Sequence, residues 1–115
     1  MKKLIFTCAF ICVSMIAFSQ EYMQMTTIES VVPGGLGRSR LIMQNSKGIM
    51  EEIKMENFFS LVGINFENVR ANDKIITEKI TELSKAGWQL QHVTPGVYST
   101  EKSTGIFITR YLFKK

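Results

Sequence analysis

The stretch NDKIITEKITELSKAGWQLQHV (residues 72–93) decides the fold. An apolar stripe with spacings of four and three, typical of an amphipathic helix, runs through its first half: Ile76, Ile80 and Leu83. We expect Asn72 or Asp73 to cap the first turn by accepting hydrogen bonds from its free amides. Gly87 ends the pattern, because glycine readily adopts the left-handed conformation that closes many helices. The stretch therefore predicts one helix over about 72–86.

The residues after this helix predict strands. Trp88 to Val93 alternates like a strand, and a hydrophobic contact with the helix is common at the position of Trp88. We therefore expect the indole to be buried. Thr94-Pro95-Gly96 should break or bulge this strand, because proline lacks a backbone donor. After a polar loop over Ser99–Gly105, Ile106 to Phe113 predicts the last strand.

The first half of the chain predicts three further strands. β-branched and aromatic residues favour a strand at 22–32, and the apolar centre Leu41-Ile42-Met43 favours a second strand at 38–44. The chain should return as a third strand at 49–55. Asn45 to Gly48 reads as a tight turn between the second and third, which should be antiparallel. Glu56 to Ala71 is apolar without a clear period, and we expect a short helical turn near 57–61 followed by an irregular segment. The order predicts an α+β fold: an antiparallel sheet of about five strands with one main amphipathic helix on one face.

Short motifs in the C-terminal half resemble a small bacterial family catalogued as domain of unknown function 4177. The motifs are Leu-Ser-x-x-Gly-Trp, Gln-Leu-x-x-Val and Tyr-x-Phe-Lys, represented here by Leu83, Ser84, Gly87, Trp88, Gln89, Leu90, Val93, Tyr111, Phe113 and Lys114. Members of that family also begin with a strand that contains tyrosine, here Tyr22. The resemblance covers about residues 72–115. It implies the same fold and carries no activity over to this chain.

Residues 1–19 have the layout of a secretory signal peptide. Lys2 and Lys3 precede an apolar run from Leu4 to Phe18, and Ala17-Phe18-Ser19 supplies small residues at a cleavage site before Gln20. The run is shorter than the roughly 20 residues that a membrane-spanning helix needs. We therefore expect cleavage, export to the periplasm or the outside of the cell, and contact with the membrane only through this segment before its removal.

Residues 20–115 are long enough for one domain with its own core. They contain neither of the two cysteines of the chain, so a thiolate nucleophile, a cysteine metal site and a disulfide are excluded there. They keep 12 of the 14 basic residues and all 10 acidic residues, a net charge of +2. This weak charge and the expected export argue against a nucleic-acid partner.

The run Gly34-Gly35-Leu36-Gly37-Arg38-Ser39-Arg40 is a candidate anion-binding site. Successive glycine amides can form a nest for an anion, and Arg38 and Arg40 could clamp a phosphate or carboxylate. Phosphate-binding loops, however, place a helix directly after their glycines, and here a strand is expected. A long connection between two strands is the competing interpretation, and the one that we favour.

Other candidate residues favour structural roles. His92 is the one histidine in the chain, and its position suggests a half-buried strand residue rather than a general base or metal ligand. Glu51 and Glu52 should point to opposite faces of their strand, which makes them a poor acid–base pair. The cluster Phe58-Phe59-Leu61-Val62 reads as core.

No catalytic, cofactor-binding or metal-binding set stands out in the sequence. The favoured hypothesis is therefore a non-enzymatic exported module that binds another envelope or extracellular protein, with the edges of its sheet as candidate binding surfaces. The alternative is a small enzyme or a small-molecule or anion-binding protein, with its pocket near the glycine loop or residues 56–71.

Overall fold

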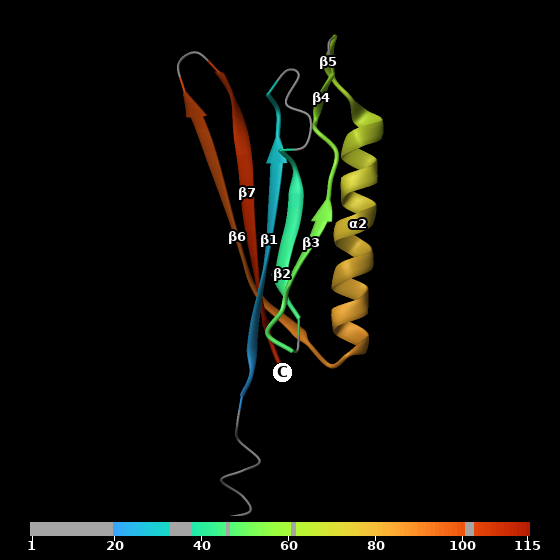
Figure 1. The fold of residues 1–115 in the computed structure, drawn as a ribbon, viewed down its shortest axis with the longest axis vertical. Coiled ribbons are helices and arrows are strands. Elements are labelled where there is room, and N and C mark those ends of the chain that lie inside the picture. The colour runs from blue at the N-terminus through green and yellow to red at the C-terminus, as the bar shows by residue number, and fades with distance from the viewer. Residues whose placement is uncertain (1–19, 33–37, 46, 61, 101–102) are drawn as a thin grey trace, which may run out of the picture.

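The sheet of this protein runs antiparallel in the order β3-β2-β1-β7-β6, with one long helix beside it (Figure 1). The computed structural model describes residues 20–32, 38–45, 47–60, 62–100 and 103–115. The elements are β1 (Tyr22–Ser30), β2 (Arg40–Gln44), β3 (Met50–Lys54), β4 (Phe59–Ser60), β5 (Gly63–Ile64), α2 (Phe66–Lys85), β6 (Gln89–Thr100) and β7 (Ser103–Lys114). The predicted α+β fold is confirmed.

The apolar half of the core follows the period of the strands. Alternate residues of β1 and β2 point toward α2, and the apolar stripe of the helix packs against them. The buried hydrophobic side chains are Met23, Met25, Leu41, Met43, Met55, Leu83, Trp88 and Phe113. Ile53, Ile75, Ile76, Ile80 and Tyr111 pack against them, partly buried. The predicted stripe therefore does face the sheet.

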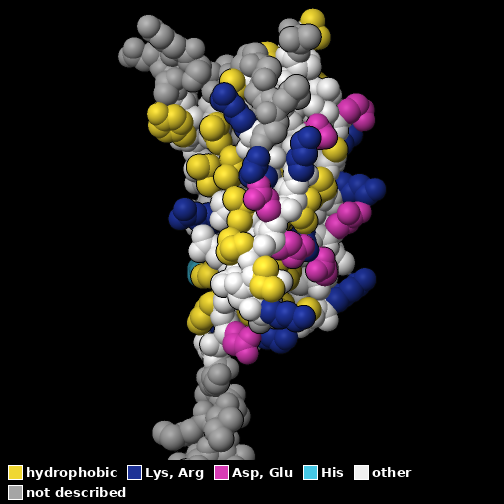
Figure 2. All heavy atoms as spheres, viewed as in Figure 1, with side chains coloured by type: hydrophobic (Ala, Val, Ile, Leu, Met, Phe, Trp, Pro, Cys, Tyr) yellow, Lys and Arg dark blue, Asp and Glu magenta, His cyan; other side chains and the backbone are white. Residues whose placement is uncertain are grey.

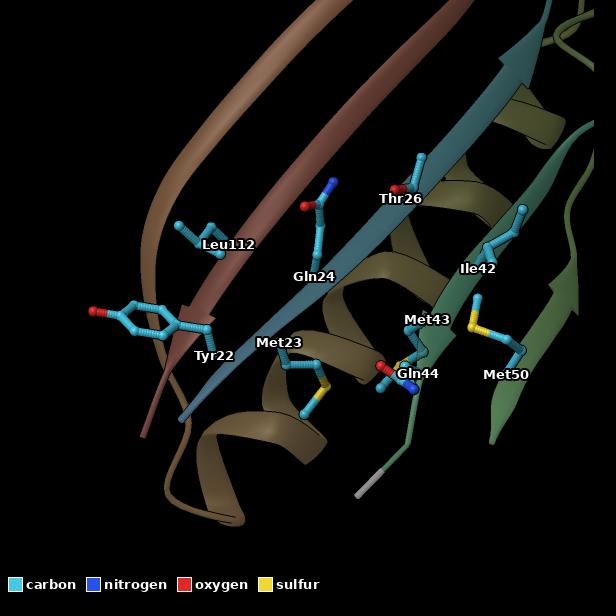
Figure 3. Close-up of a pocket in the computed structure, with 9 residues that line it drawn as sticks. All are labelled: Tyr22, Met23, Gln24, Thr26, Ile42, Met43, Gln44, Met50 and Leu112. Atoms are coloured by element: carbon cyan, nitrogen blue, oxygen red, sulfur yellow. The ribbon is translucent and has the colours of Figure 1, made fainter. Parts of the chain in front are cut away.

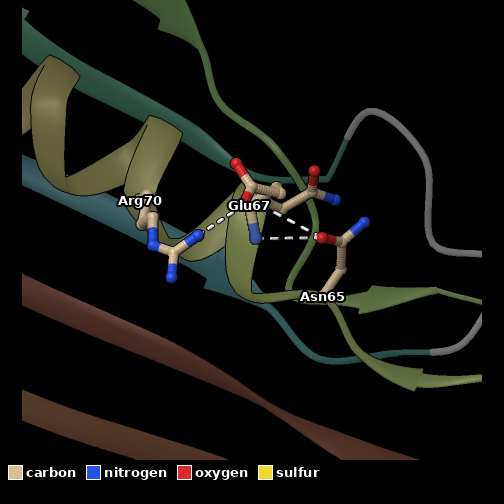
Figure 4. Close-up of polar contacts among 4 residues, drawn as sticks. Asn65, Glu67 and Arg70 are labelled. Carbon is tan, nitrogen blue, oxygen red and sulfur yellow. Dashed lines mark hydrogen bonds and ion pairs between the residues drawn. The ribbon is translucent and has the colours of Figure 1, made fainter.

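The N-cap of the helix lies seven residues before Asn72, the first of the two predicted caps. Asn65 is the N-cap, and its side-chain oxygen accepts hydrogen bonds from the amides of Glu67 (3.0 Å) and Asn68 (3.4 Å) (Figure 4). Arg70 adds an ion pair with Glu67 in the first turns. The prediction of Asn72 or Asp73 as the cap is wrong, because Asn72 lies inside the helix and is fully buried. A polar side chain there interrupts the apolar stripe on which the prediction relied.

The segment before the helix is a small hairpin. β4 and β5 pair through Phe59 and Ile64, so the short helical turn predicted near 57–61 is wrong. Gly63 makes the turn possible with a φ of 135°, a value that residues with a Cβ rarely adopt. Val62 is 98% exposed and Phe58 and Phe59 are half-buried, so the expected core cluster is only partly inside, while Leu61 lies outside the described residues.

The C-terminus of the helix is closed as predicted. Gly87 has a φ of 92°, and the Trp88 and Gly87 amides donate to the carbonyls of Leu83 and Ser84, both at 3.0 Å. This pair of bonds is the Schellman arrangement, which satisfies carbonyls that the helix leaves free. The Trp88 side chain is 9% exposed, and the ammonium of Lys115 lies 5.5 Å from the ring centroid.

The strand β6 runs without a break through Thr94-Pro95-Gly96, contrary to the prediction. β6 lies at an edge of the sheet, where a residue without an N–H is tolerated. The irregularities fall instead between Leu90 and His92 and between Tyr98 and Thr100. The predicted loop over Ser99–Gly105 is also too long, because β6 reaches Thr100 and β7 starts at Ser103.

The remaining predictions for the first half hold with shorter ends. β1, β2 and β3 lie within the three predicted strands, with β1 beginning and β2 ending where predicted, and β2 and β3 are antiparallel as expected. Gly48 has a φ of 79°, and its amide donates to the Asn45 carbonyl (3.0 Å) in the predicted turn. The glycine loop from Pro33 to Gly37 lies outside the described residues.

Candidate functional site

The described part of the candidate anion site consists of its two arginines. Arg38 is exposed ahead of β2. Arg40 lies on β2 and forms an ion pair with Glu52 of the neighbouring strand. A carboxylate therefore already engages one of the two proposed clamp residues, while Gly34, Gly35 and Gly37 lie outside the described residues.

The two adjacent glutamates of β3 separate as predicted. Glu51 is directly opposite buried Met43 and points toward the helix, where it meets the ammonium of Lys79 at 2.9 Å. Lys79 is buried and also contacts Glu82 at 3.0 Å. Burial lowers the pKa of this ammonium, but the hydrogen bonds and the negative charges of Glu51 and Glu82 together raise it by more, so the pKa lies above its ordinary value. Lys79 therefore connects α2 to β3 through a charged ion pair with Glu51.

His92 lies on the helix-free face of the sheet and is exposed, so the prediction of a half-buried position is wrong. The irregularity after Leu90 shifts the register, and His92 pairs with Leu112 rather than continuing the face of Leu90 and Phe113. There His92 lines a shallow depression of about 360 Å³ with Arg110. Among the described residues, no three His, Cys, Asp or Glu side chains lie close enough to hold a metal ion.

A second depression, of about 440 Å³, occupies the same helix-free face (Figure 3). Its lining has phenol, hydroxyl, amide, thioether and aliphatic groups, from Tyr22, Gln24, Thr26, Ile42, Gln44, Met50 and Leu112. Met23 and Met43, whose buried side chains belong to the core, complete the lining. Figure 3 shows these side chains spread along β1, β2, β3 and β7, with α2 behind the sheet. They form a broad open surface and supply no acid–base pair. In the described part of the chain, no helix has the length and apolar character to span a membrane.

Comparison with protein-family models, curated proteins and solved structures finds no match to this chain. The resemblance of its C-terminal motifs to a domain of unknown function thus remains a hypothesis. The candidate site has to be identified from its own geometry.

The helix–sheet interface has a polar half that the sequence analysis did not identify. The Asn72 side chain donates to the Glu56 carbonyl (2.8 Å) and to the carboxylate of Glu29 (3.2 Å). It also accepts a bond from the Glu56 amide (2.8 Å). A titratable group, Glu29, is thereby held under the helix. Its alternation with Met23, Met25 and Thr27 on β1 is the signal that could have placed it on the inner face.

Glu29, Asp73 and Tyr111 are close enough to influence one another. Burial raises the pKa of the Glu29 carboxyl, the charge of Asp73 raises it further, and the hydrogen bond from Asn72 lowers it. Burial likewise raises the pKa of the Tyr111 phenol, with added contributions from both carboxylates. Because the Glu29 carboxylate is hydrogen-bonded to the helix, the raised pKa of this carboxyl bears on the stability of the fold.

Replacing Glu29 with Gln should raise the melting temperature at pH 7. A carboxyl whose pKa is higher in the folded chain binds its proton more tightly when the chain is folded. Its contribution to the free energy of unfolding is therefore fully present below the unfolded pKa of about 4.5 and is lost as the pH rises through the folded pKa. Glutamine has no charge to desolvate and keeps an oxygen for Asn72. Thermal melts from pH 3 to 8 should show the gain shrinking toward acid pH. A constant difference, or one shared by exposed Glu21→Gln, would contradict this reading.

Exposed hydrophobic side chains also occur on β6 and β7. Five of their hydrophobic side chains are exposed, and we call them the β6–β7 patch: Leu90, Val93, Val97, Tyr98 and Phe107. Leu90, Val93 and Val97 of β6 share the inner face of the sheet with Phe107 of β7. The pairing shows this, because these three β6 residues are directly opposite Phe113, Tyr111 and Phe107, in that order. The helix covers only one end of this face: exposure rises along β7 from 1% at Phe113 to 39% at Phe107.

The view in Figure 2 shows the same division of the surface. Hydrophobic side chains gather over the strands on the left, and most acidic and basic side chains lie in the centre and over the helix on the right. Figure 1 shows why: β6 and β7 rise on the side of the sheet away from α2, and their hairpin diverges from it. The ring of Phe58 lies 6.3 Å from that of Phe107, centroid to centroid, and among the described residues no helix covers the rest of this apolar sheet surface.

The two edges of the sheet differ in charge. β3 has three charged residues among its five, Glu51, Glu52 and Lys54. β6 has none among its twelve. Charged side chains on an edge discourage the addition of another strand, and proline and β-bulges do the same. The β6 edge has no charged residue, but Pro95 and the two pairing irregularities divide it into short stretches that an added strand could reach. The uncharged run at 89–100 is visible in the sequence and is the signal that could have identified this edge.

Proposed function

We propose that the protein is a non-enzymatic exported binding module whose binding surface is the edge of β6 together with the β6–β7 patch. The observation that carries the proposal is the combination of an exposed, uncharged edge strand with adjacent exposed hydrophobic side chains. Backbone groups on such an edge can bond to an added strand, and neighbouring side chains give it an apolar surface to cover. Export is proposed from the leader-like residues 1–19.

The composition of the patch also supports a protein partner. It contains Tyr98 and Phe107, and aromatic residues are enriched at protein interfaces, while Lys and Glu are depleted there. Exposed hydrophobic residues scattered singly need no explanation, but four of these five share the inner face of two paired strands, and Tyr98 lies beside them on the other face. A small-molecule pocket would need a concave site, whereas the depressions on the other face are shallow.

A photo-cross-linking amino acid at position 97 should give discrete adducts in cells that express the full chain. Val97 is 66% exposed at the centre of the proposed surface, so the probe should not disturb the fold. The matched control is position 50, because Met50 is 63% exposed on the opposite edge strand. Adducts are read by gel and mass spectrometry after the envelope and culture medium have been separated from the cytoplasm.

The expected result is adduct formation at position 97 well above position 50, recovered outside the cytoplasm. Equal adducts at the two positions, or none at position 97, would remove the β6 surface as a binding site. Adducts found only in the cytoplasm would remove export from the proposal.

A further inference from the structure

We propose that the helix-free face of the sheet binds a linear polysaccharide that carries carboxylate groups, and that Arg110 binds one of these carboxylates. This inference goes beyond the proposed function, because it concerns a different surface and a different ligand. The surface consists of the side chains of β1, β2, β3, β6 and β7 that point away from α2. It does not include the inner-face residues of the β6–β7 patch.

Charge is the first argument. Directly opposite residues of paired strands lie on the same face, so the strand registers assign the charged residues of the described strands to one face or the other. The helix-free face receives four basic residues and one acidic residue: Arg40, Lys54, Arg110, Lys114 and Glu52. Its net charge is therefore +3, whereas residues 20–115 together have +2. A face with an excess of one charge attracts ligands of the opposite charge.

Arg110 is the central cation of this face. Its side chain is exposed, and it forms no ion pair with any described residue. The residues directly opposite it, Thr26 on β1 and Thr94 on β6, are uncharged. Arg40, by contrast, is already engaged by Glu52. A guanidinium can bind a carboxylate through two parallel hydrogen bonds, which fix the orientation of the anion as well as its position.

The shape of the face suits a polymer. The two depressions described above share Gln24 and Leu112, so they adjoin. Together they extend from His92 on β6 to Met50 on β3, and Figure 3 shows the larger one open along β1 and β2. Five neighbouring strands span about 19 Å, since adjacent strands lie about 4.8 Å apart. An extended chain can lie across such a surface, whereas a compact small molecule needs a deeper pocket.

The lining offers both kinds of contact that a sugar chain makes. The side chains of Gln24, Thr26 and Thr94 make no hydrogen bond within the described part of the chain, and each has donor and acceptor atoms. Leu112 and Ile42 add aliphatic surface beside them. Sugar rings present hydroxyl groups at their edges and C–H groups on their faces. The polar side chains can bond to the hydroxyl groups, and the aliphatic side chains can pack against the C–H groups.

The same lining argues against two other polyanions. Single-stranded nucleic acids are held by aromatic side chains on which successive bases stack. In the described part of this face, the aromatic residues Tyr22 and Tyr98 lie at its two ends. Anionic membrane surfaces are bound by large apolar side chains beside basic ones. Two threonines and the amide of Gln24 surround Arg110 instead.

Calorimetric titration with polygalacturonate, in which every sugar carries a carboxylate, tests the proposal. The full-length chain, purified as the expressing bacterium leaves it, should bind this polymer and should not bind uncharged dextran. Arg110→Gln should raise the dissociation constant about fivefold, because it removes one exposed ion pair and keeps an amide. Lys74→Gln is the matched control, because it changes the net charge equally on α2, where the Lys74 side chain is 75% exposed.

The control should change the dissociation constant less than about twofold, since salt screens a charge so far from the bound polymer. Equal effects of Arg110→Gln and Lys74→Gln would overturn Arg110 as the binding residue. Equal binding of polygalacturonate and dextran would overturn the role of charge.

A second substitution separates hydrogen bonding from charge. Gln24→Leu keeps the net charge, so it should raise the dissociation constant about threefold and leave the dependence on sodium chloride unchanged. Arg110→Gln should instead make binding less sensitive to salt, because it removes a charge that salt screens. An unchanged salt dependence in Arg110→Gln would overturn its ion pair with a carboxylate. Undiminished binding by Gln24→Leu would overturn the two depressions as the place where the polymer lies.

Two further titrations identify the source of the anion. Vesicles of phosphatidylglycerol present phosphates on a membrane, and oligothymidylate presents them on single-stranded DNA. Tighter binding to either than to polygalacturonate would overturn the polysaccharide as the ligand. Binding to none of the three would overturn the helix-free face as an anion-binding surface. Neither result changes the photo-adducts expected at position 97, so the proposed function is tested separately.

Discussion

Trp88→Ala should lower the free energy of unfolding by about 3–5 kcal/mol. The indole is 9% exposed and belongs to the apolar core with Leu83 and Phe113, directly after the helix ends. Removing it leaves a cavity at the junction of α2 and β6, and the surrounding residues can close it only in part. Since small domains unfold with about 5–15 kcal/mol in total, the variant should lose a large share of its stability.

Urea titration followed by far-ultraviolet circular dichroism measures this loss. Fluorescence cannot be used, because Trp88 is the only tryptophan of the chain. The helix cap should survive, since alanine keeps the backbone amide that donates to Leu83. Lys115→Ala is the control for the cation–π contact and should cost no more than about 1 kcal/mol. A cost below about 1 kcal/mol for Trp88→Ala would show that the indole is not part of the core.

The predictable parts of the fold are those where one local signal acts alone. The spacing of Ile76, Ile80 and Leu83 predicts the inner face of the helix, and Gly87 predicts its end, because no tertiary contact opposes these signals. The strands of the first half follow from their β-branched residues in the same way. Their ends shift by one or two residues, which local propensity does not define.

The unpredicted parts depend on long-range contacts. The start of the helix was missed because Asn72 faces the core as a polar residue, a position that only its bonds to Glu29 and Glu56 make favourable. Pro95 reads as a strand breaker, but the edge position of β6 makes it harmless. The orientation of His92 depends on an irregularity in the pairing of β6 with β7, which the sequence of β6 alone does not show.

The candidate site also has a part that the sequence predicts and a part that depends on long-range contacts. The sequence drew attention to Arg38 and Arg40, but it could not show that Glu52 on the next strand engages Arg40. The strand content of the sequence predicts that sheet edges are candidate surfaces, and the order of the strands in the sheet decides which strands are edges. Once β6 is known to be an edge, its lack of charge becomes informative.

Substitution of the buried asparagine inside the helix, Asn72, should cause the second large loss of stability. Asn72→Ala should lower the free energy of unfolding by about 2–4 kcal/mol. The substitution leaves the amide and the carbonyl of Glu56 without their partner and frees the Glu29 carboxylate beneath the helix. Each unsatisfied buried group costs about 1–3 kcal/mol, and the better helix propensity of alanine returns less than about 1 kcal/mol.

Asn68→Ala is the matched control, because it makes the same change one turn earlier in α2. Asn68 is partly buried and its side chain donates one bond, to the Asn57 carbonyl (2.7 Å). Its loss should therefore cost about 1 kcal/mol, with the same gain in helix propensity. Urea titrations of both variants at pH 7 separate the two effects. Equal losses in the free energy of unfolding would mean that the bonds of Asn72 stabilise the fold no more than those of an ordinary half-buried amide. Another contact would then hold the first half of the helix against β1.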